Sequence, residues 1–160
     1  MADNDLPSPT GTETVDLVRL MEQVGPLVDA AELREYEPNR WAIAFDDELG
    51  IEIEQDAVSG KVVLYTNLGH VPAGDEAASY KLLLQVAAMW RETGGLRMGL
   101  DPTDDSVIQI YDFPLAGVKL DDLVVQLRNF AALAHHAREV LAAGTGALAD
   151  EGDAQHFVRV

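Results

Sequence analysis

The chain of 160 residues has no cysteine, which excludes disulfides, thiolate metal sites and cysteine nucleophiles. Its first residues are polar and lack a basic segment followed by an apolar run, so we expect no secretory signal peptide. No uncharged apolar run reaches the roughly 18 residues of a membrane span, so we expect no membrane insertion. These absences together favour a cytoplasmic protein in a reducing compartment.

Basic residues are also scarce, with 11 Lys and Arg against 28 Asp and Glu and a formal net charge of −17 at pH 7. A surface this acidic repels phosphates, so nucleic acid and anionic membrane are excluded as expected partners. A basic or amphipathic polypeptide is favoured. Acidity that serves only solubility is an equally open interpretation.

The length fits one domain. Residues 1–12 are rich in Pro, Ser, Thr and Asp and predict a disordered lead. Residues 13–143 carry the periodic apolar patterns of a single folded domain. Residues 144–160, with several Gly and acidic residues, predict a flexible acidic tail.

Two apolar periods alternate along this domain, one typical of helices and one of strands. The first helix begins near Thr12 or Thr14 and ends before Gly25 and Pro26. The further helices are expected over 75–92 and 120–141, and the strands over 40–46, 49–54, 62–65, 97–100 and 106–113. Short connections predict an antiparallel sheet. The fold class is α+β, an antiparallel sheet packed with helices in the order α-β-β-β-α-β-β-α.

The second helix is apolar on nearly all sides, because only Ser79, Lys81 and Gln85 are polar between Ala77 and Trp90. Such a helix must be covered on nearly all sides, and its own sheet covers only one. We therefore expect a second subunit against it, with a homodimer interface formed by Tyr80, Leu84, Val86, Met89 and Leu100.

No residue pattern predicts chemistry. Neighbouring His135 and His136 point about 100° apart on a helix, so they are poorly placed to share a metal ion. The loop residue His70 has no nucleophile that the sequence assigns to it, and Asp101, Asp104 and Asp105 lack the spacing of a calcium loop. We expect no catalytic residue, no metal site and no cofactor, so the protein is not expected to be an enzyme.

Four segments carry a resemblance to a known family. They are Asn67–Pro72, Leu82–Ala87, Thr93–Asp101 with its pattern Gly-Gly-x-x-x-Gly-Leu-Asp, and Phe113–Val118. In this order they resemble type III secretion chaperones of the Tir-chaperone type, and the resemblance covers about residues 12–142. Two departures are Ala87–Trp90, where the family often has Asn, and the long link from Pro26 to Asn39.

The resemblance implies a homodimer in the bacterial cytoplasm. It would bind the non-globular N-terminal region of a secreted effector protein, keep that region export-competent and meet the secretion export apparatus. The first helix and first three strands would then carry apolar grooves and an open strand edge. The expected effector-binding residues are Leu17, Leu20, Val24, Trp41, Ile43, Phe45 and Leu64. The alternative is a non-secretory dimeric regulatory or ligand-binding domain of similar topology.

Overall fold

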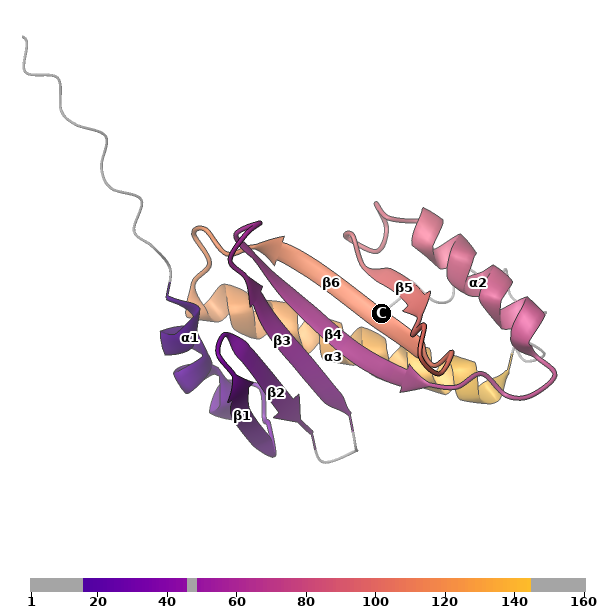
Figure 1. Ribbon diagram of the computed structural model, residues 1–160, viewed down its shortest axis with the longest axis horizontal. Coiled ribbons are helices and arrows are strands. Elements are labelled where there is room, and N and C mark those ends of the chain that lie inside the picture. Colours follow the sequence, from indigo (N-terminus) through magenta and orange to yellow (C-terminus); the bar gives the residue numbers. More distant parts are fainter. Residues whose placement is uncertain (1–15, 46–48, 145–160) are drawn as a thin grey trace, which may run out of the picture.

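The computed structural model of the protein describes residues 16–45 and 49–144 (Figure 1). One six-stranded antiparallel sheet in the order β1-β2-β3-β4-β6-β5 is packed with helices. Along the chain the elements are α1 (Leu17–Val24), the 3-10 helix η1 (Gly25–Leu27), β1 (Glu32–Glu37), β2 (Arg40–Ala44), β3 (Gly50–Asp56), β4 (Lys61–Gly69), α2 (Glu76–Ala88), β5 (Arg97–Leu100), β6 (Val107–Pro114) and α3 (Leu120–Ala143). The expected lead at 1–12, nearly all of the expected tail and the turn at 46–48 lie outside the described residues.

The α+β class and the antiparallel sheet are confirmed, but the sheet has one strand more than expected. The link from Pro26 to Asn39 contains β1, which pairs with β2 at the edge of the sheet. Five of its six residues are exposed, so its sequence shows no apolar alternation. The hairpin to β2 turns at Asn39, whose φ of 64° suits an asparagine.

Two helix ends also differ from the expectation. Helix α1 begins at Leu17, later than Thr12 or Thr14, because the Asp16 carboxylate caps it by accepting a hydrogen bond from the Val18 N–H at 3.1 Å. Helix α2 ends at Ala88 and not near Glu92. The Gly95 N–H donates to the Trp90 carbonyl at 2.9 Å, and Gly94 and Gly95 both have positive φ, so residues 89–95 form a turn.

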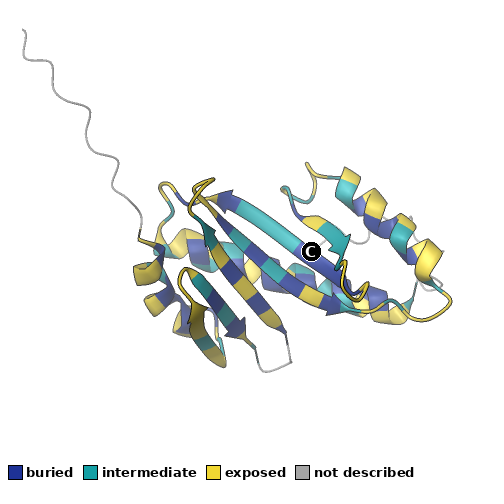
Figure 2. Ribbon diagram, viewed as in Figure 1, coloured by how far each residue is buried: buried dark blue, intermediate teal, exposed yellow. Residues whose placement is uncertain are grey.

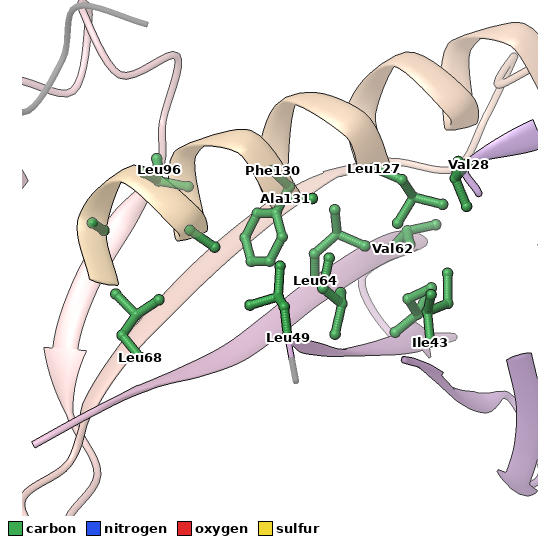
Figure 3. Packing of buried hydrophobic residues seen from close by; sticks show 14 of the residues in the cluster. Val28, Ile43, Leu49, Val62, Leu64, Leu68, Leu96, Leu127, Phe130 and Ala131 are labelled. Atoms are coloured by element: carbon green, nitrogen blue, oxygen red, sulfur yellow. The ribbon is translucent and has the colours of Figure 1, made fainter. Parts of the chain in front are cut away.

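The core lies between one face of the sheet and helices α1 and α3. Leu127 and Phe130 on α3 point toward Val62 and Leu64 on β4, as Figure 3 shows. The buried Gln109 on β6 donates from Nε2 to the Phe130 carbonyl at 3.0 Å, which ties the helix to the strand beneath it. This side of the sheet is closed by the chain's own side chains.

The opposite face of the sheet, called the outer face below, carries no helix among the described residues. In the view of Figure 1 this face points toward the reader and α3 runs behind it. Buried and exposed residues alternate along β3 (Figure 2). The cross-strand pairs Arg40–Glu54, Glu52–Tyr65 and Tyr65–Ile110 place these side chains together on the outer face.

Within residues 16–45 and 49–144, no helix combines the length and the apolar character needed to cross a membrane.

Candidate protein-binding surfaces

Most of the residues expected to contact an effector lie inside the core. Leu17, Val24, Trp41, Ile43 and Leu64 are each at most 3% exposed and belong to the main apolar cluster. Leu20 and Phe45 are half-buried at its margin. Only these last two side chains offer surface to a second molecule in this conformation, because the alternating pattern marks the face that points toward α3.

Sequence reasoning missed the apolar side chains that do reach the surface near α1 and β1. They are Val18, Leu27 and Tyr36, each about 40% exposed. The Leu27 carbonyl accepts a hydrogen bond from Nη2 of Arg128 on α3 at 2.7 Å, which holds the turn after α1 against the long helix. We call the surface formed by Val18, Leu20, Leu27 and Phe45 the α1–β1 surface; Tyr36 lies on the opposite face of the sheet, where its hydroxyl bonds Glu52.

An open strand edge adjoins this surface. Strand β1 ends the sheet, and no further strand pairs with it among the described residues. An edge strand presents unpaired backbone donors and acceptors to which an extended segment can add. The side chains along β1 are mostly acidic, with Glu32, Glu35 and Glu37 against Arg34, so a basic segment suits this edge best.

Helix α2 presents a second apolar surface. Its buried residues Leu82, Leu83 and Val86 face the chain's own core, while Leu84 is 74% exposed and Trp90, just beyond the helix, is 60% exposed. Among the other expected dimer residues, Tyr80, Met89 and Leu100 are half-buried. Val86 is therefore turned inward, and Leu84 has the largest exposed fraction of the five expected dimer residues.

The outer face contains a hollow of about 200 Å³, lined by Tyr36, Arg40, Glu52, Glu54, Val63, Tyr65 and Ile110. The Tyr36 hydroxyl donates to Glu52 Oε2 at 2.9 Å, and Arg40 Nη2 donates to Glu54 Oε2 at 2.8 Å. Burial, followed by the bond to the Glu52 carboxylate, raises the pKa of Tyr36. Tyr36 is therefore a neutral phenol at neutral pH.

Beside this hollow, Asp112 on β6 bridges two cations on neighbouring strands. Lys61 Nζ lies 2.6 Å from Asp112 Oδ2, and Arg97 pairs with the other carboxylate oxygen. The hydrogen bond from Lys61, and then the contact with Arg97, hold the pKa of Asp112 below its usual value. This triad ties β4, β5 and β6 together on the outer face.

A second hollow of about 220 Å³ lies on the inner side, between α3 and the turn before β5. It is lined by Thr93, Gly94, Leu96, Tyr111, Gln126, Asn129, Phe130 and Leu133.

Among the described residues, the histidines and acidic residues are the candidate ligands for a metal ion. In the part of the chain that the structure describes, no group of three or more His, Asp and Glu residues could hold an ion. His70 lies on the surface with Nε2 3.1 Å from the Asp104 carbonyl oxygen, and His135 and His136 are half-buried on α3. Asp101 and Asp104 accept hydrogen bonds from Thr103 and Ser106 in the turn that joins β5 to β6.

Comparison with known proteins relates this arrangement to one family. Residues 16–138 match the family model of the Tir chaperone protein (CesT) family. No curated protein matches the sequence.

Several solved structures share the fold. A chain of the HopA1–SchA chaperone–effector complex superposes with a TM-score of 0.64 at 14% identity, covering 82% of this chain and 100% of its own. A chain of the ExsC–ExsE complex superposes with a TM-score of 0.66 at 16% identity, covering 81% and 96%. YbjN from E. coli superposes with a TM-score of 0.52 at 13% identity, covering 74% and 85%.

Proposed function

This chain belongs to the Tir chaperone protein (CesT) family, and on that premise we propose that it is a type III secretion chaperone. It binds the N-terminal region of a secreted effector protein, keeps that region non-globular and so keeps it competent for export. The family match over residues 16–138 carries this proposal. The fold supports the proposal, because one chain from the HopA1–SchA complex and one from the ExsC–ExsE complex each superpose on more than four fifths of this chain.

The α1–β1 surface and the edge of β1 are the proposed effector site. An extended segment adds to β1 through main-chain hydrogen bonds, and its apolar side chains cover Leu20, Leu27 and Phe45. The remaining expected residues, such as Ile43 and Leu64, support this surface from the core and do not touch the effector. A segment that becomes ordered on binding loses conformational entropy, so a long contact gives only moderate affinity.

Helix α2 is the proposed homodimer contact. Leu84 on α2 is 74% exposed, and Trp90, two residues beyond the end of the helix, is 60% exposed. A two-fold contact buries the same patch on both subunits, so it covers Leu84 on each of them. Tyr80, Met89 and Leu100 lie partly exposed and complete the proposed interface, with Val86 packed behind it.

The proposed setting is the bacterial cytoplasm, where the complex meets the export apparatus. The proposed role requires no catalysis and no cofactor, since holding a segment extended needs only surface and hydrogen bonds. The family and the fold of chaperones support this assignment.

Copurification with a defined effector fragment tests the proposal. The chain is immobilised and exposed to a lysate of a type III secreting bacterium, and the N-terminal fragment of each captured protein is then produced with a ¹⁵N label. We expect one fragment to form a stable complex with two copies of the chain, and its bound amide resonances to lack the dispersion of a globular domain. A fragment that folds on its own, or the absence of any stable complex, contradicts the proposal.

One observation favours a second candidate function. YbjN of E. coli, known as a putative transcription regulator, shares the fold at a TM-score of 0.52. A non-secretory dimeric regulatory or ligand-binding domain therefore fits the same topology. Such a domain predicts a dimer that captures no effector fragment, so the same experiment separates the two.

A further inference from the structure

The hollow on the outer face is not used by the surfaces assigned above. It spans five adjacent strands, with Tyr36 on β1, Arg40 on β2, Glu52 on β3, Tyr65 on β4 and Ile110 on β6. Part of its lining is apolar, because Val63 and Ile110 contribute to it. Its volume of about 200 Å³ is enough for one long side chain.

The charges around the hollow are unbalanced. Within its lining the carboxylates of Glu52 and Glu54 stand against one cation, Arg40, which also contacts Glu37 outside the lining. Arg40 is already engaged, because Nη2 lies 2.8 Å from Glu54 Oε2 and Nη1 lies 3.4 Å from Glu37 Oε2. Asp101 adds a further carboxylate at the far wall, where it accepts a hydrogen bond from the Tyr65 hydroxyl at 3.2 Å.

Among these carboxylates, Glu52 can still accept further hydrogen bonds. It accepts one hydrogen bond, from the Tyr36 hydroxyl, and has no ion-pair partner among the described residues. A carboxylate accepts more than one donor, and two parallel N–H groups of a guanidinium match it geometrically. Arg40 in the same hollow contacts two carboxylates, Glu54 through Nη2 and Glu37 through Nη1.

The aromatic walls favour the same kind of ligand. Two tyrosines lie next to Glu52 on β3: Tyr65 is its cross-strand partner on β4, and Tyr36 reaches it from β1 through the hydroxyl hydrogen bond. A planar guanidinium stacks on aromatic faces more readily than an ammonium does, and its three-carbon stem packs on apolar side chains such as Val63 and Ile110.

We propose that this hollow is a specificity pocket for an arginine side chain of the effector segment. The proposal rests on the proposed function and deepens it, because it names a side chain that the segment must carry. The pocket opens on the outer face, which carries no helix among the described residues, so a part of the effector segment that lies over this face can present an arginine to it. The pocket excludes neutral and acidic side chains, which leave Glu52 without a cation.

A short peptide pair tests the pocket directly. The peptide Ac-Gly-Ser-Arg-Ser-Gly-NH₂ is titrated into the ¹⁵N-labelled chain, and a second peptide carries citrulline, the neutral analogue of arginine. We expect the arginine peptide to shift the amide resonances of Val63, Tyr65 and Ile110, and the citrulline peptide to leave them in place. Equal shifts from both peptides, or shifts confined to other residues, overturn the proposal.

Two variants should change the affinity for the arginine peptide in opposite directions, and a third is the control. Glu52→Gln weakens binding of the arginine peptide by about threefold or more, because the acceptor loses its charge. Arg40→Gln strengthens it by about threefold, because the internal competitor for the carboxylates is removed. Glu139→Gln, an exposed position on α3, leaves binding unchanged. A Glu52→Gln variant that binds like the wild type, or an Arg40→Gln variant that binds more weakly while folded, refutes the pocket.

The experiments can refute the arginine pocket and the proposed chaperone function independently of each other. If the wild-type chain captures an effector fragment but discriminates neither peptide, the chaperone proposal stands and the pocket is refuted. If no fragment is captured and the arginine peptide still binds in the hollow, the pocket stands without its proposed partner.

Discussion

Asp112 shows how one side chain couples three strands on an open face. Its carboxylate is only 14% exposed, whereas Lys61 and Arg97 remain about half exposed to water. Screening by that water reduces the strength of each ion pair. The contribution of Asp112 to stability therefore comes mainly from its charge-assisted hydrogen bonds, and it depends on pH.

We expect Asp112→Asn to lower the free energy of unfolding by about 1 kcal/mol at pH 7. The pKa of Asp112 is lowered in the folded state, so its stabilisation is complete above the unfolded value of about 4 and is lost as pH falls through the folded pKa. Urea unfolding of both proteins at neutral and at acidic pH measures this. The difference in the free energy of unfolding between wild type and Asp112→Asn should become smaller at acidic pH, and a difference that does not change with pH would falsify this explanation. Glu22→Gln, at an exposed position, is the control.

Leu64 is the clearest case of a residue whose apolar character indicates packing and not binding. It is fully buried beneath α3. Leu64→Ala should lower the free energy of unfolding by about 3 kcal/mol, because the cavity left under α3 cannot collapse completely. Val125→Ala, at a residue 53% exposed on the same helix, should change it by less than about 0.5 kcal/mol. Effector affinity per folded molecule should match the wild type in both, as isothermal titration would report.

At the scale of elements, helices and central strands could be predicted because each buries one face. Strands β2, β3 and β4 repeat apolar residues every second position, and α3 repeats them at helical spacing. Strand β1 could not be predicted in this way, since both of its faces meet water over most of its length. The same logic explains the binding residues. The alternation of apolar and polar residues predicts Trp41 and Ile43 as binding residues, but both are buried in the core. It does not predict Tyr36, which lies outside the alternating pattern.

Helix α2 carries the prediction about association. Leu84→Glu places a charge in the proposed two-fold contact, and we expect the dimer to dissociate to monomer in sedimentation velocity runs. Val125→Glu is the matched control, because it introduces the same charge at an exposed apolar position of another helix. A Leu84→Glu variant that sediments as the wild-type dimer removes α2 from the interface.

At the scale of the whole molecule, charge governs the approach of a partner more than the strength of the complex. The formal net charge of −17 attracts a basic segment over a distance set by the ionic strength. The association rate with a basic effector fragment should fall about tenfold between about 20 mM and 500 mM salt, while the dissociation rate changes little. Stopped-flow fluorescence separates the two rates, and an association rate that ignores salt would show that the acidity serves solubility alone.

The family and fold class could be read from the sequence because motifs and periodicity are local properties. For the two proposed interfaces, the sequence names elements but not which of their side chains reach the surface. Which side of α2 faces outward, and where the hollow over β1, β2, β3, β4 and β6 opens, depend on how the elements pack against one another. Leu84 and Val86 are two positions apart, and only the packing of α2 against the core distinguishes the exposed side chain from the buried one.

The acidic edge of β1 also determines how the protein meets copies of itself. If two copies paired their β1 strands antiparallel, Glu32 of each copy would lie opposite Glu37 of the other. Repulsion between these glutamates disfavours pairing of two exposed β1 strands into fibrils. A cationic segment can still bind at the same edge. Repulsion between copies of the protein weakens near its isoelectric point of about 4.3, where the net charge of the chain falls to zero. Acidic storage buffers should therefore favour precipitation of the protein without its partner.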